Sequence, residues 1–437
     1  MLTTTQEIAA PASGWRRITH HPSLMEYRRL LAMVLITNGL ALYTGIENGR
    51  WFADGHFNLH SLSTLALVNF TLSILIRQQR VINALFWLAT RIPTSWPLWI
   101  RWGAGKVFHF GGLHYGGAYA GSLWFAAFFG GMLYNQSKGA ETLSTSTLIS
   151  SAAILLLLML IIATAIRPMR TRYHNIFEKV HRFAGWSVLA LFWLQSASIS
   201  QHSGIPFLGS FAFWALCLIT LSVASPWLTL KRVDVQISKP SNHVALVRFD
   251  YGDTPFAGSS NAISHTPFGE YHAFANIPAP NETGYRLAIS RAGDWTGEFI
   301  DKPPKKVWVK GITTSGVARI EDLFTKVVYV GTGSGIGPIL PHLLKRKVPN
   351  RLIWSTRSPH KTYGEALVDE IISHTEKPVI WDTDTHGKPD LSALALQAVR
   401  ESGAEAVIVI SNQKLTRKVV HDMESLGIPA YGAIWDS

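Results

Sequence analysis

The sequence is nearly without cysteine and is poor in acidic residues. Of its 437 residues, one, Cys217, is a cysteine. A single cysteine excludes a disulfide framework, a zinc site held by several thiolates and an iron–sulfur cluster within one chain. Lys and Arg number 40 against 28 Asp and Glu, a formal charge of +12. Much of this excess lies in short loops between apolar runs, so it indicates a membrane surface as partner, and no nucleic acid is expected.

Long apolar runs fill the first half of the chain. They predict six transmembrane helices, at residues 29–47, 57–76, 107–134, 147–166, 182–200 and 206–228. Basic residues gather between the second and third runs and between the fourth and fifth. By the positive-inside rule, this asymmetry predicts a multi-pass protein of the plasma or inner membrane with both termini in the cytoplasm. Residues 81–91 are too short to cross and are expected to form an interfacial helix.

Four histidines stand near the starts of two predicted spans. His109 and His114 are at the start of the third span, and His174 and His181 are at the start of the fifth, which enters from the same side. Because an imidazole within lipid is costly without a partner, these residues are the candidate metal ligands. One imidazole from each span suffices to ligate a haem iron. His114 with His181 is the preferred pair, and His109 and His174 are the alternatives.

The spacing of these histidines limits the haems to one. His174 and His181 are seven residues apart, or about 10.5 Å along a helix, which is too close for two stacked haems. No later histidine follows in span three, and Gln195 stands where span five needs one. Two other interpretations stay open: the histidines bond to neighbouring helices, or they line a site for a quinone or another substrate.

From Lys231 the chain changes to the patterns of a water-soluble α/β protein. Short alternating strands such as residues 233–238 and 244–249 predict an antiparallel β-barrel over residues 231–325. After Lys326, strands alternate with helical stretches, which predicts a doubly wound parallel sheet over residues 326–437. The expected fold class is therefore a six-span helical bundle over residues 1–230, then a β-barrel domain, then an α/β domain.

A glycine-rich turn follows the first strand of the predicted parallel sheet. Its residues include Gly331, Thr332, Gly333, Gly335, Gly337 and Pro338. Glycines let the backbone approach a pyrophosphate, and the helix that follows directs free amide groups at the negative charge, so the turn predicts NADPH or NADH. Arg357 and Lys388 come after the second and third strands. Cations at these places favour the 2′-phosphate of NADPH.

Two further motifs carry a resemblance to a known family. They are Tyr271-His272-Ala273-Phe274 and, twenty-one residues after the histidine, Gly293-Asp294-Trp295-Thr296. With the domain order, they resemble the NADPH oxidase and ferric reductase superfamily, which joins a six-helix transmembrane domain to a ferredoxin-NADP-reductase-like flavin module. The resemblance implies FAD, with His272 and Phe274 beside its ring and diphosphate and the backbone of 293–296 near phosphate.

The chain departs from that family pattern in three places. Ala275 replaces the hydroxyl residue that usually bonds the flavin, with Asn276 the nearest substitute, and Ser411-Asn412-Gln413 replaces a Cys-Gly-Pro turn near the nicotinamide. A second haem pair is also missing. The stretches 174–186 and 428–437 look like a subgroup of fungal membrane proteins that carry an adenylation domain before the same helices.

The resemblance implies a membrane-bound NAD(P)H:acceptor oxidoreductase. Electrons are expected to pass from NAD(P)H through FAD to a single haem b or to an acceptor within the bundle. One alternative is a flavin reductase without haem that acts on a lipophilic substrate, and another is a non-enzymatic membrane redox sensor. The expected partners are the lipid bilayer and an acceptor or lipophilic substrate that the sequence does not identify.

Overall fold

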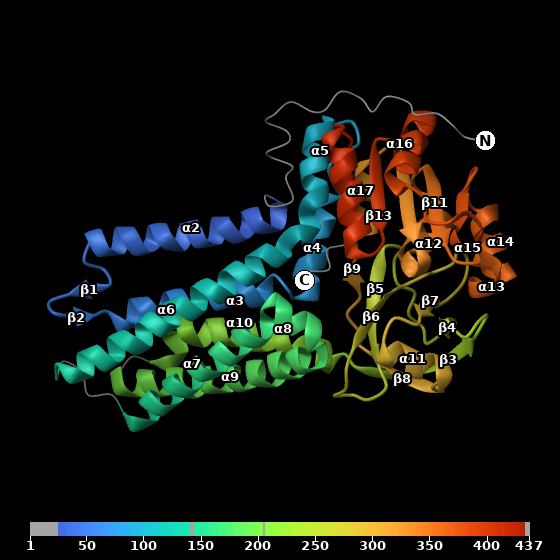
Figure 1. Cartoon of the computed structure of the whole chain (residues 1–437). Helices are drawn as coiled ribbons and strands as arrows, with labels where there is room; N and C mark the ends of the chain where they lie inside the picture. The colour runs from blue at the N-terminus through green and yellow to red at the C-terminus, as the bar shows by residue number, and fades with distance from the viewer. Residues whose placement is uncertain (1–24, 140–143, 204–205, 433–437) are drawn as a thin grey trace. The chain divides into compact units, whose positions relative to one another are not determined.

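The computed structural model describes residues 25–139, 144–203 and 206–432 (Figure 1). Their contacts divide the chain into two compact units. The helical unit comprises residues 27–78 and 110–225, and the sheet unit comprises the described residues before 27, residues 79–109 and those from 226 onward. The expected domain boundaries near residues 230 and 325 stay a prediction, but residues 79–109 belong with the later part of the chain.

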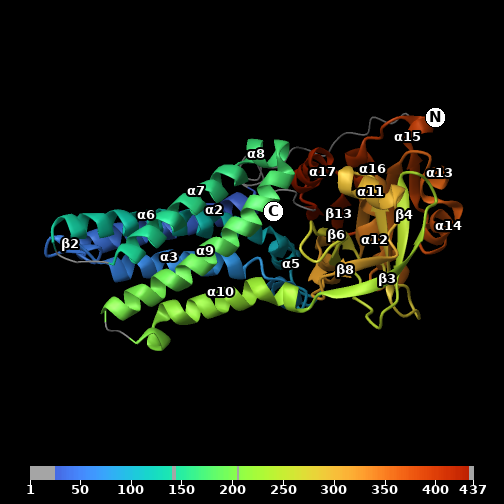
Figure 2. The same cartoon turned by 90° about the horizontal axis from the view of Figure 1, so that it is seen from below.

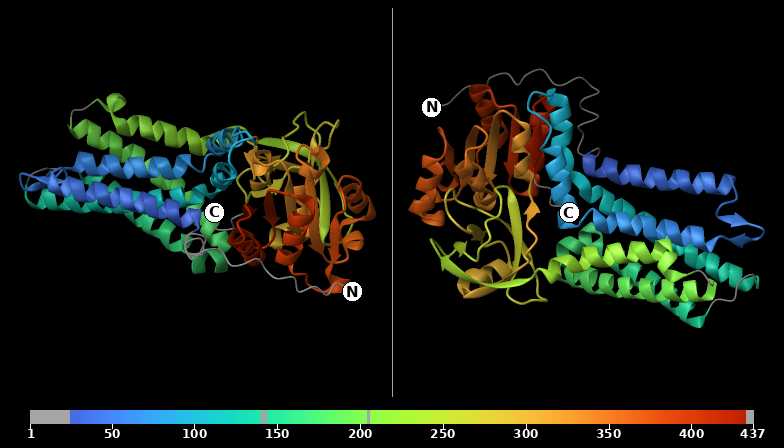
Figure 3. Two further views of the ribbon diagram at one scale, coloured as in Figure 1. Left: turned by 90° about the horizontal axis from the view of Figure 1, so that it is seen from above. Right: turned by 180° about the vertical axis from the view of Figure 1, so that it is seen from behind.

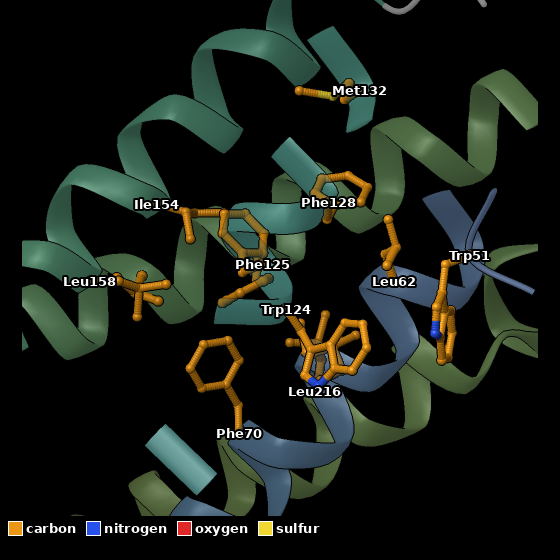
Figure 4. Packing of buried hydrophobic residues seen from close by; sticks show 14 residues of the cluster. Trp51, Leu62, Phe70, Trp124, Phe125, Phe128, Met132, Ile154, Leu158 and Leu216 are labelled. Carbon is orange, nitrogen blue, oxygen red and sulfur yellow. The ribbon is translucent and has the colours of Figure 1, made fainter. Parts of the chain in front are cut away.

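The helical unit is built from long helices that run alongside one another (Figure 3). Its helices are α2 (Glu26–Glu47), α3 (Leu59–Leu75), α6 (Gly111–Ser137), α7 (Thr145–Ala165), α8 (Arg167–Arg172), α9 (His174–Ser203), the short η3 (Phe207–Gly209) and α10 (Phe211–Leu228). A small hairpin of β1 (Phe52–Ala53) and β2 (His56–Phe57) joins α2 to α3. Helix α3 packs on α6 and α7 on α9, around a core that includes Phe70, Trp124, Phe125 and Phe128 (Figure 4).

The prediction of a six-span bundle is wrong. Helices occur at all six expected places, but among the described residues only α2, α7, α9 and α10 are long and apolar enough to cross a membrane, with a fifth span if α3 and α4 (Gln79–Ala89), bent by 70°, count as one. Helix α3 has 17 residues, about 26 Å, which falls short of a bilayer core. Helix α6 is long enough but contains glycines, His114 and Asn135, which lower its hydropathy.

Residues 79–109 belong to the sheet unit through specific polar contacts. They form α4, α5 (Leu98–Ala104) and the start of η2 (Gly105–Phe110). The Asn83 side chain donates to the carbonyl of Thr313 at 2.7 Å and accepts from the amide of Ser315 at 2.8 Å. Arg101, buried within α5, forms two hydrogen bonds of 2.8 and 3.0 Å with Glu405. These contacts bring the segment expected as an interfacial helix onto the sheet unit.

The predicted β-barrel is confirmed. Its strands are β3 (Lys231–Ser238), β4 (Val244–Phe249), β5 (Ser259–Ser264), β6 (His272–Ala275), β7 (Tyr285–Ser290), β8 (Lys306–Val309) and β9 (Thr314–Ser315), with helix α11 (Asp294–Asp301) and η4 (Val317–Leu323). They pair antiparallel in the order β6-β5-β8-β3-β4-β7, with β9 on β5. Figure 2 shows β3, β4, β6 and β8 of this barrel. A bridge between Ile277, beyond β6, and Arg286 of β7 joins the two ends of the sheet and closes the barrel.

The predicted doubly wound parallel sheet is also confirmed. Its strands are β10 (Val327–Thr332), β11 (Asn350–Thr356), β12 (Val379–Asp382), β13 (Ala406–Ile410) and β14 (Ala430–Gly432). Its helical segments are η5 (Gly333–Gly335), α12 (Ile336–Lys345), α13 (Pro359–Tyr363), α14 (Glu365–Ser373), α15 (Thr383–His386), α16 (Leu391–Ser402) and α17 (Gln413–Ser425). Helices α16 and α17 share one core with the sheet, while α12 packs on the opposite face, where His342 contacts the ring of Tyr329.

Candidate functional site

The parallel sheet reverses its strand order between β10 and β13. Its order is β12-β11-β10-β13-β14, so the first strand in sequence lies beside the fourth, and both connections start from this point. In open parallel sheets, ligands bind outside the carboxyl ends of the strands at such a switch point. The predicted glycine turn leaves β10 here and leads into α12.

The glycines of this turn allow close packing against β13. A Cβ atom added at Gly335 would lie 2.1 Å from the carbonyl oxygen of Ile410, so only glycine fits. Gly333 has φ +51°, a left-handed conformation that favours glycine, and its carbonyl accepts from the Trp354 indole at 2.9 Å. Thr332 and Ser411, at the ends of β10 and β13, hydrogen-bond through their hydroxyls at 2.6 Å. The turn is therefore held from both neighbouring strands.

The other glycines of the predicted turn lie against α12 and the barrel. Gly331 leaves room for Ile339, whose Cδ1 atom would lie 2.8 Å from an added Cβ. Gly337 and Pro338 occupy the first turn of α12, and a Cβ at Gly337 would lie 3.8 Å from Ala288 of β7. A ligand bound at the switch point is therefore close to one strand of the barrel.

The two predicted phosphate cations lie at the same edge of the sheet. Arg357 follows β11 and Lys388 follows β12, and both side chains are exposed. The loops that hold them are tied together, because the Asp382 carboxylate accepts from the Ser358 amide at 2.9 Å. Hydrogen bonds from the amides of Asp384 and Ser358 lower the pKa of Asp382, so it stays ionised and orders both loops.

On the barrel, the first family-like motif forms an aromatic surface with α11. His272 and Phe274 alternate along β6 and so share one face of the strand. The Trp295 ring lies 4.4 Å from that of His272 and 6.0 Å from that of Phe274, centroid to centroid. His265 lies 5.0 Å from the same ring, and burial lowers its pKa. Its Nε2 atom is buried and has no hydrogen-bond partner among the described residues.

The second motif begins α11 and presents backbone toward open space. The Thr296 hydroxyl accepts from the amides of Ala292 at 2.8 Å and Gly293 at 3.1 Å. A Cβ added at Gly293 would meet no atom within 4 Å. Asp294 and Trp295 are the first two residues of the helix, positions whose amides have no acceptor within the helix. The open glycine and these amides fit a phosphate group.

Asn276 stands apart from the other predicted flavin residues. Its side chain is fully buried and donates to the Ser259 hydroxyl at 2.9 Å. Its Oδ1 atom is buried without a partner among the described residues. A contact between Asn276 and a flavin stays a prediction.

The four candidate metal ligands separate into three environments. His114 and His181 lie together in the helical unit, with ring centroids 6.2 Å apart. His174 is exposed and lies 3.7 Å from Glu178 on its own helix. His109 is buried in the sheet unit, 3.7 Å from a Glu26 oxygen. The metal assignment stays a prediction, and among the described residues no group of three or more His, Cys, Asp or Glu side chains is placed to hold a metal ion.

One residue at the aromatic surface, His265, belongs to neither of the sequence motifs. Its ring lies 5.0 Å from that of Trp295 and 5.6 Å from that of Phe299. No local signal marked it, because it directly follows β5 and comes near His272 only when β5 pairs with β6.

Comparison with known proteins finds similarity to adenylate-forming reductases over almost the whole chain. The family model for the C-terminal domain of adenylate-forming reductase 03009 matches residues 317–437. Adenylate-forming reductase 03009 of Coprinopsis cinerea is 41% identical over 429 residues, which cover 96% of this chain and 41% of that protein. Adenylate-forming reductase 06235 of the same organism is 39% identical over 428 residues, with the same coverage. The chain therefore spans about two-fifths of the length of the curated relatives it matches.

Among solved structures, a ferredoxin NADP⁺ reductase from Neisseria gonorrhoeae with bound FAD and NADP is similar at 12% identity and a TM-score of 0.38. The likeness covers 47% of this chain and 98% of that one. A likeness of this size is too small to support conclusions about function.

These findings correct the expected family and activity. The chain resembles adenylate-forming reductases, so its assignment to the ferric reductase and NADPH oxidase superfamily is wrong. The narrower resemblance, to fungal proteins with an adenylation domain, agrees with the names of the relatives. The predicted transfer of electrons to a membrane haem and the predicted multi-pass topology with cytoplasmic termini are wrong as well, because they depended on that superfamily and on six spans.

The glycines of α6 do not clear space for a haem macrocycle. Added Cβ atoms at Gly112, Gly116 and Gly117 would instead strike Tyr27, Val34 and Asn69 at 2.1 to 2.7 Å. These glycines allow α6 to pack closely on α2 and α3.

Proposed function

We propose that this chain is an NAD(P)H-dependent flavin reductase and that it carries the reductive half of an activity like that of the adenylate-forming reductases. The name of those relatives joins two reactions, formation of an adenylate and a reduction. The glycine turn at the switch point of a parallel sheet suits the reduction, because such a turn binds a nicotinamide nucleotide. The family model that matches the end of this chain describes a C-terminal domain, which agrees with a reductive part at that end.

One observation carries the proposal: the two cofactor sites meet within the sheet unit. The glycine turn η5 contacts β7 of the barrel, and α12 contacts β6, the strand of His272 and Phe274. Arg286 of β7 and Glu370 of α14 form a bidentate ion pair with distances of 2.7 and 3.0 Å. The ion pair fixes the barrel against the parallel sheet, and the contact of α12 with β6 supports a nucleotide site close to that strand.

The residues of the chain have separate tasks in this mechanism. The turn from Gly331 to Gly337 binds the nucleotide pyrophosphate, and Arg357 and Lys388 bind a 2′-phosphate. The amides at the start of α11 bind the flavin phosphates, while His272, Phe274 and Trp295 exclude water from the ring. When bound, the nicotinamide supplies a hydride and FAD accepts it. Thr332 and Ser411 hold the mouth of the nucleotide site in position.

The test is the FAD content of matched variants of the full chain. Phe274→Ala and Gly293→Trp are expected to remove FAD, because the first deletes a ring contact and the second fills the open approach to the α11 amides. Phe268→Ala, a change to a 69% exposed phenylalanine in the same domain, is the control and should keep FAD. Stoichiometric FAD in both site variants would contradict the assigned flavin site.

A further inference from the structure

A tyrosine of α13 stands in front of the glycine turn. A Cβ atom added at Gly333 would lie 3.7 Å from the Tyr363 hydroxyl oxygen and, beyond its chain neighbours, within 4 Å of no other described atom. The Tyr363 side chain is 1% exposed, and its ring lies 5.0 Å from that of Trp354, centroid to centroid. Trp354 in turn donates to the carbonyl of Gly333. Ring packing therefore holds the hydroxyl beside the side of Gly333 from which a ligand can reach the backbone.

Two further hydroxyls lie near that of Tyr363. Thr356 ends β11 and Ser290 ends β7 of the barrel, and both side chains are buried. Burial raises the pKa of Tyr363, and the neighbouring hydroxyls of Ser290 and Thr356 lower it by less, so the phenol keeps its proton at neutral pH. The Ser290 Oγ atom is nevertheless buried without a hydrogen-bond partner of normal geometry among the described residues. Such a hydroxyl is costly to the fold unless a ligand accepts its proton.

Contacts between the barrel and α13 fix the place of these hydroxyls. The Ser241 hydroxyl, which follows β3, donates to the carbonyl of Thr362 at 2.7 Å. Gly364 has φ +87°, and a Cβ added there would lie 3.0 Å from Pro240. The turn η5 itself contacts β7. One hydroxyl therefore approaches the glycine turn from the barrel and the other two from the parallel sheet.

We propose that Tyr363 and Ser290 donate hydrogen bonds to the pyrophosphate of the nicotinamide nucleotide, so that the parallel sheet and the barrel bind it jointly. Both hydroxyls can donate, and the phosphate oxygens carry negative charge and only accept. Tyr363 lies on the β11 side of the turn, as does Arg357, which was assigned to the adenosine end. The group in front of Gly333 is then the pyrophosphate that follows the adenosine. This inference rests on the proposed function, because it adds two residues to the same nucleotide site.

Titration of the purified, FAD-loaded full chain with NADP⁺ and with NAD⁺ tests the two hydroxyls, because the oxidised nucleotides bind without reducing the flavin. Tyr363→Phe removes the hydroxyl and keeps the ring against Trp354. It is expected to weaken both nucleotides about tenfold, since a hydrogen bond to a charged group contributes on that order. Ser290→Ala should weaken both by a similar factor. Equal losses for the two nucleotides distinguish this contact from that of Arg357 and Lys388, which concerns the 2′-phosphate alone.

Tyr285→Phe is the matched control. Tyr285 belongs to the same strand as Ser290, is fully buried, and has its hydroxyl bonded to those of Tyr251 and the Asn261 amide within the barrel. Its loss should lower the melting temperature and leave both affinities unchanged. Wild-type affinities in Tyr363→Phe or in Ser290→Ala would overturn the joint site while the proposed reductase function stands.

Two other outcomes would also overturn the inference. If Tyr285→Phe lost as much nucleotide affinity as Tyr363→Phe, the affinity would follow the stability of the barrel and not a contact with the pyrophosphate. If the wild type bound neither NADP⁺ nor NAD⁺, the proposed function itself would fail, and this inference with it.

Discussion

The two units of this protein differ in the groups that surround their positively charged side chains. In the sheet unit, three buried or half-buried cations have carboxylate partners: Arg101 pairs with Glu405, Lys106 with Glu424 and Arg286 with Glu370. In the helical unit, the groups that act on Arg77 are two tyrosines and a second arginine. Paired charges stabilise one fixed arrangement, so the contrast assigns structural pairing of charge to the sheet unit.

The largest effect is expected from Gly335→Val in the sheet unit. Its Cβ would lie 2.1 Å from the Ile410 carbonyl, so the turn must move away from β13. We expect a loss of about 3 kcal/mol in the free energy of unfolding and no measurable NADPH binding. Denaturant unfolding and NADPH titration measure the two effects. Gly103→Ala, an exposed position of α5 where an added Cβ meets open space, is the control. Normal NADPH affinity in Gly335→Val would show that the turn is not the nucleotide site.

The second-largest effect is expected from Arg101→Ala, which removes one of these ion pairs. Removing the buried guanidinium leaves Glu405, whose side chain is 25% exposed, without its ion-pair partner. We therefore expect the free energy of unfolding to fall by about 3 kcal/mol, the low end for a broken buried pair. Arg91→Ala, in the same segment but exposed over Trp87, is the control. Equal stability of the two variants would contradict the assignment of residues 79–109 to the sheet unit.

The same pair predicts a pH dependence. Hydrogen bonds from Arg101 lower the pKa of Glu405, so the folded state binds this proton less readily than the unfolded state. The resulting stability is present above the ordinary glutamate pKa and is lost as the pH falls through the lower, folded pKa. Between about pH 5 and pH 3, wild type should therefore lose more unfolding free energy than Arg101→Ala. If the unfolding free energies of the two proteins fell in parallel over this pH range, the predicted contribution of the ion pair would be contradicted.

The prediction of the sheet unit succeeded where the signal is local. The turn from Gly331 to Gly337 follows a short apolar strand and precedes a helix, so both its fold and its place could be read from adjacent residues. The partners of Asn83 and Arg101 could not, because they lie more than 200 positions away in sequence. An apolar helix with a few polar residues gives the same local pattern whether it faces lipid or protein. The sequence pattern therefore overestimated the number of transmembrane helices.

A smaller effect is expected from Arg357→Ala combined with Lys388→Ala. Only NADPH carries the extra phosphate, so the double variant should lose about tenfold in NADPH affinity and little in NADH affinity. Both side chains are exposed, and stability should not change. Titration with each nucleotide measures the difference. Equal losses for NADPH and NADH would show that these two cations do not bind the 2′-phosphate.

Anaerobic rapid mixing of the FAD-loaded full chain with NADPH tests the central claim most directly, with flavin absorbance as the signal. The account predicts that NADPH bleaches the flavin in wild type, that Arg77→Ala in the helical unit bleaches at the wild-type rate, and that Gly335→Val does not bleach. A wild-type protein that binds FAD but keeps its flavin oxidised in excess NADPH would contradict the assignment of reductase chemistry to the sheet unit.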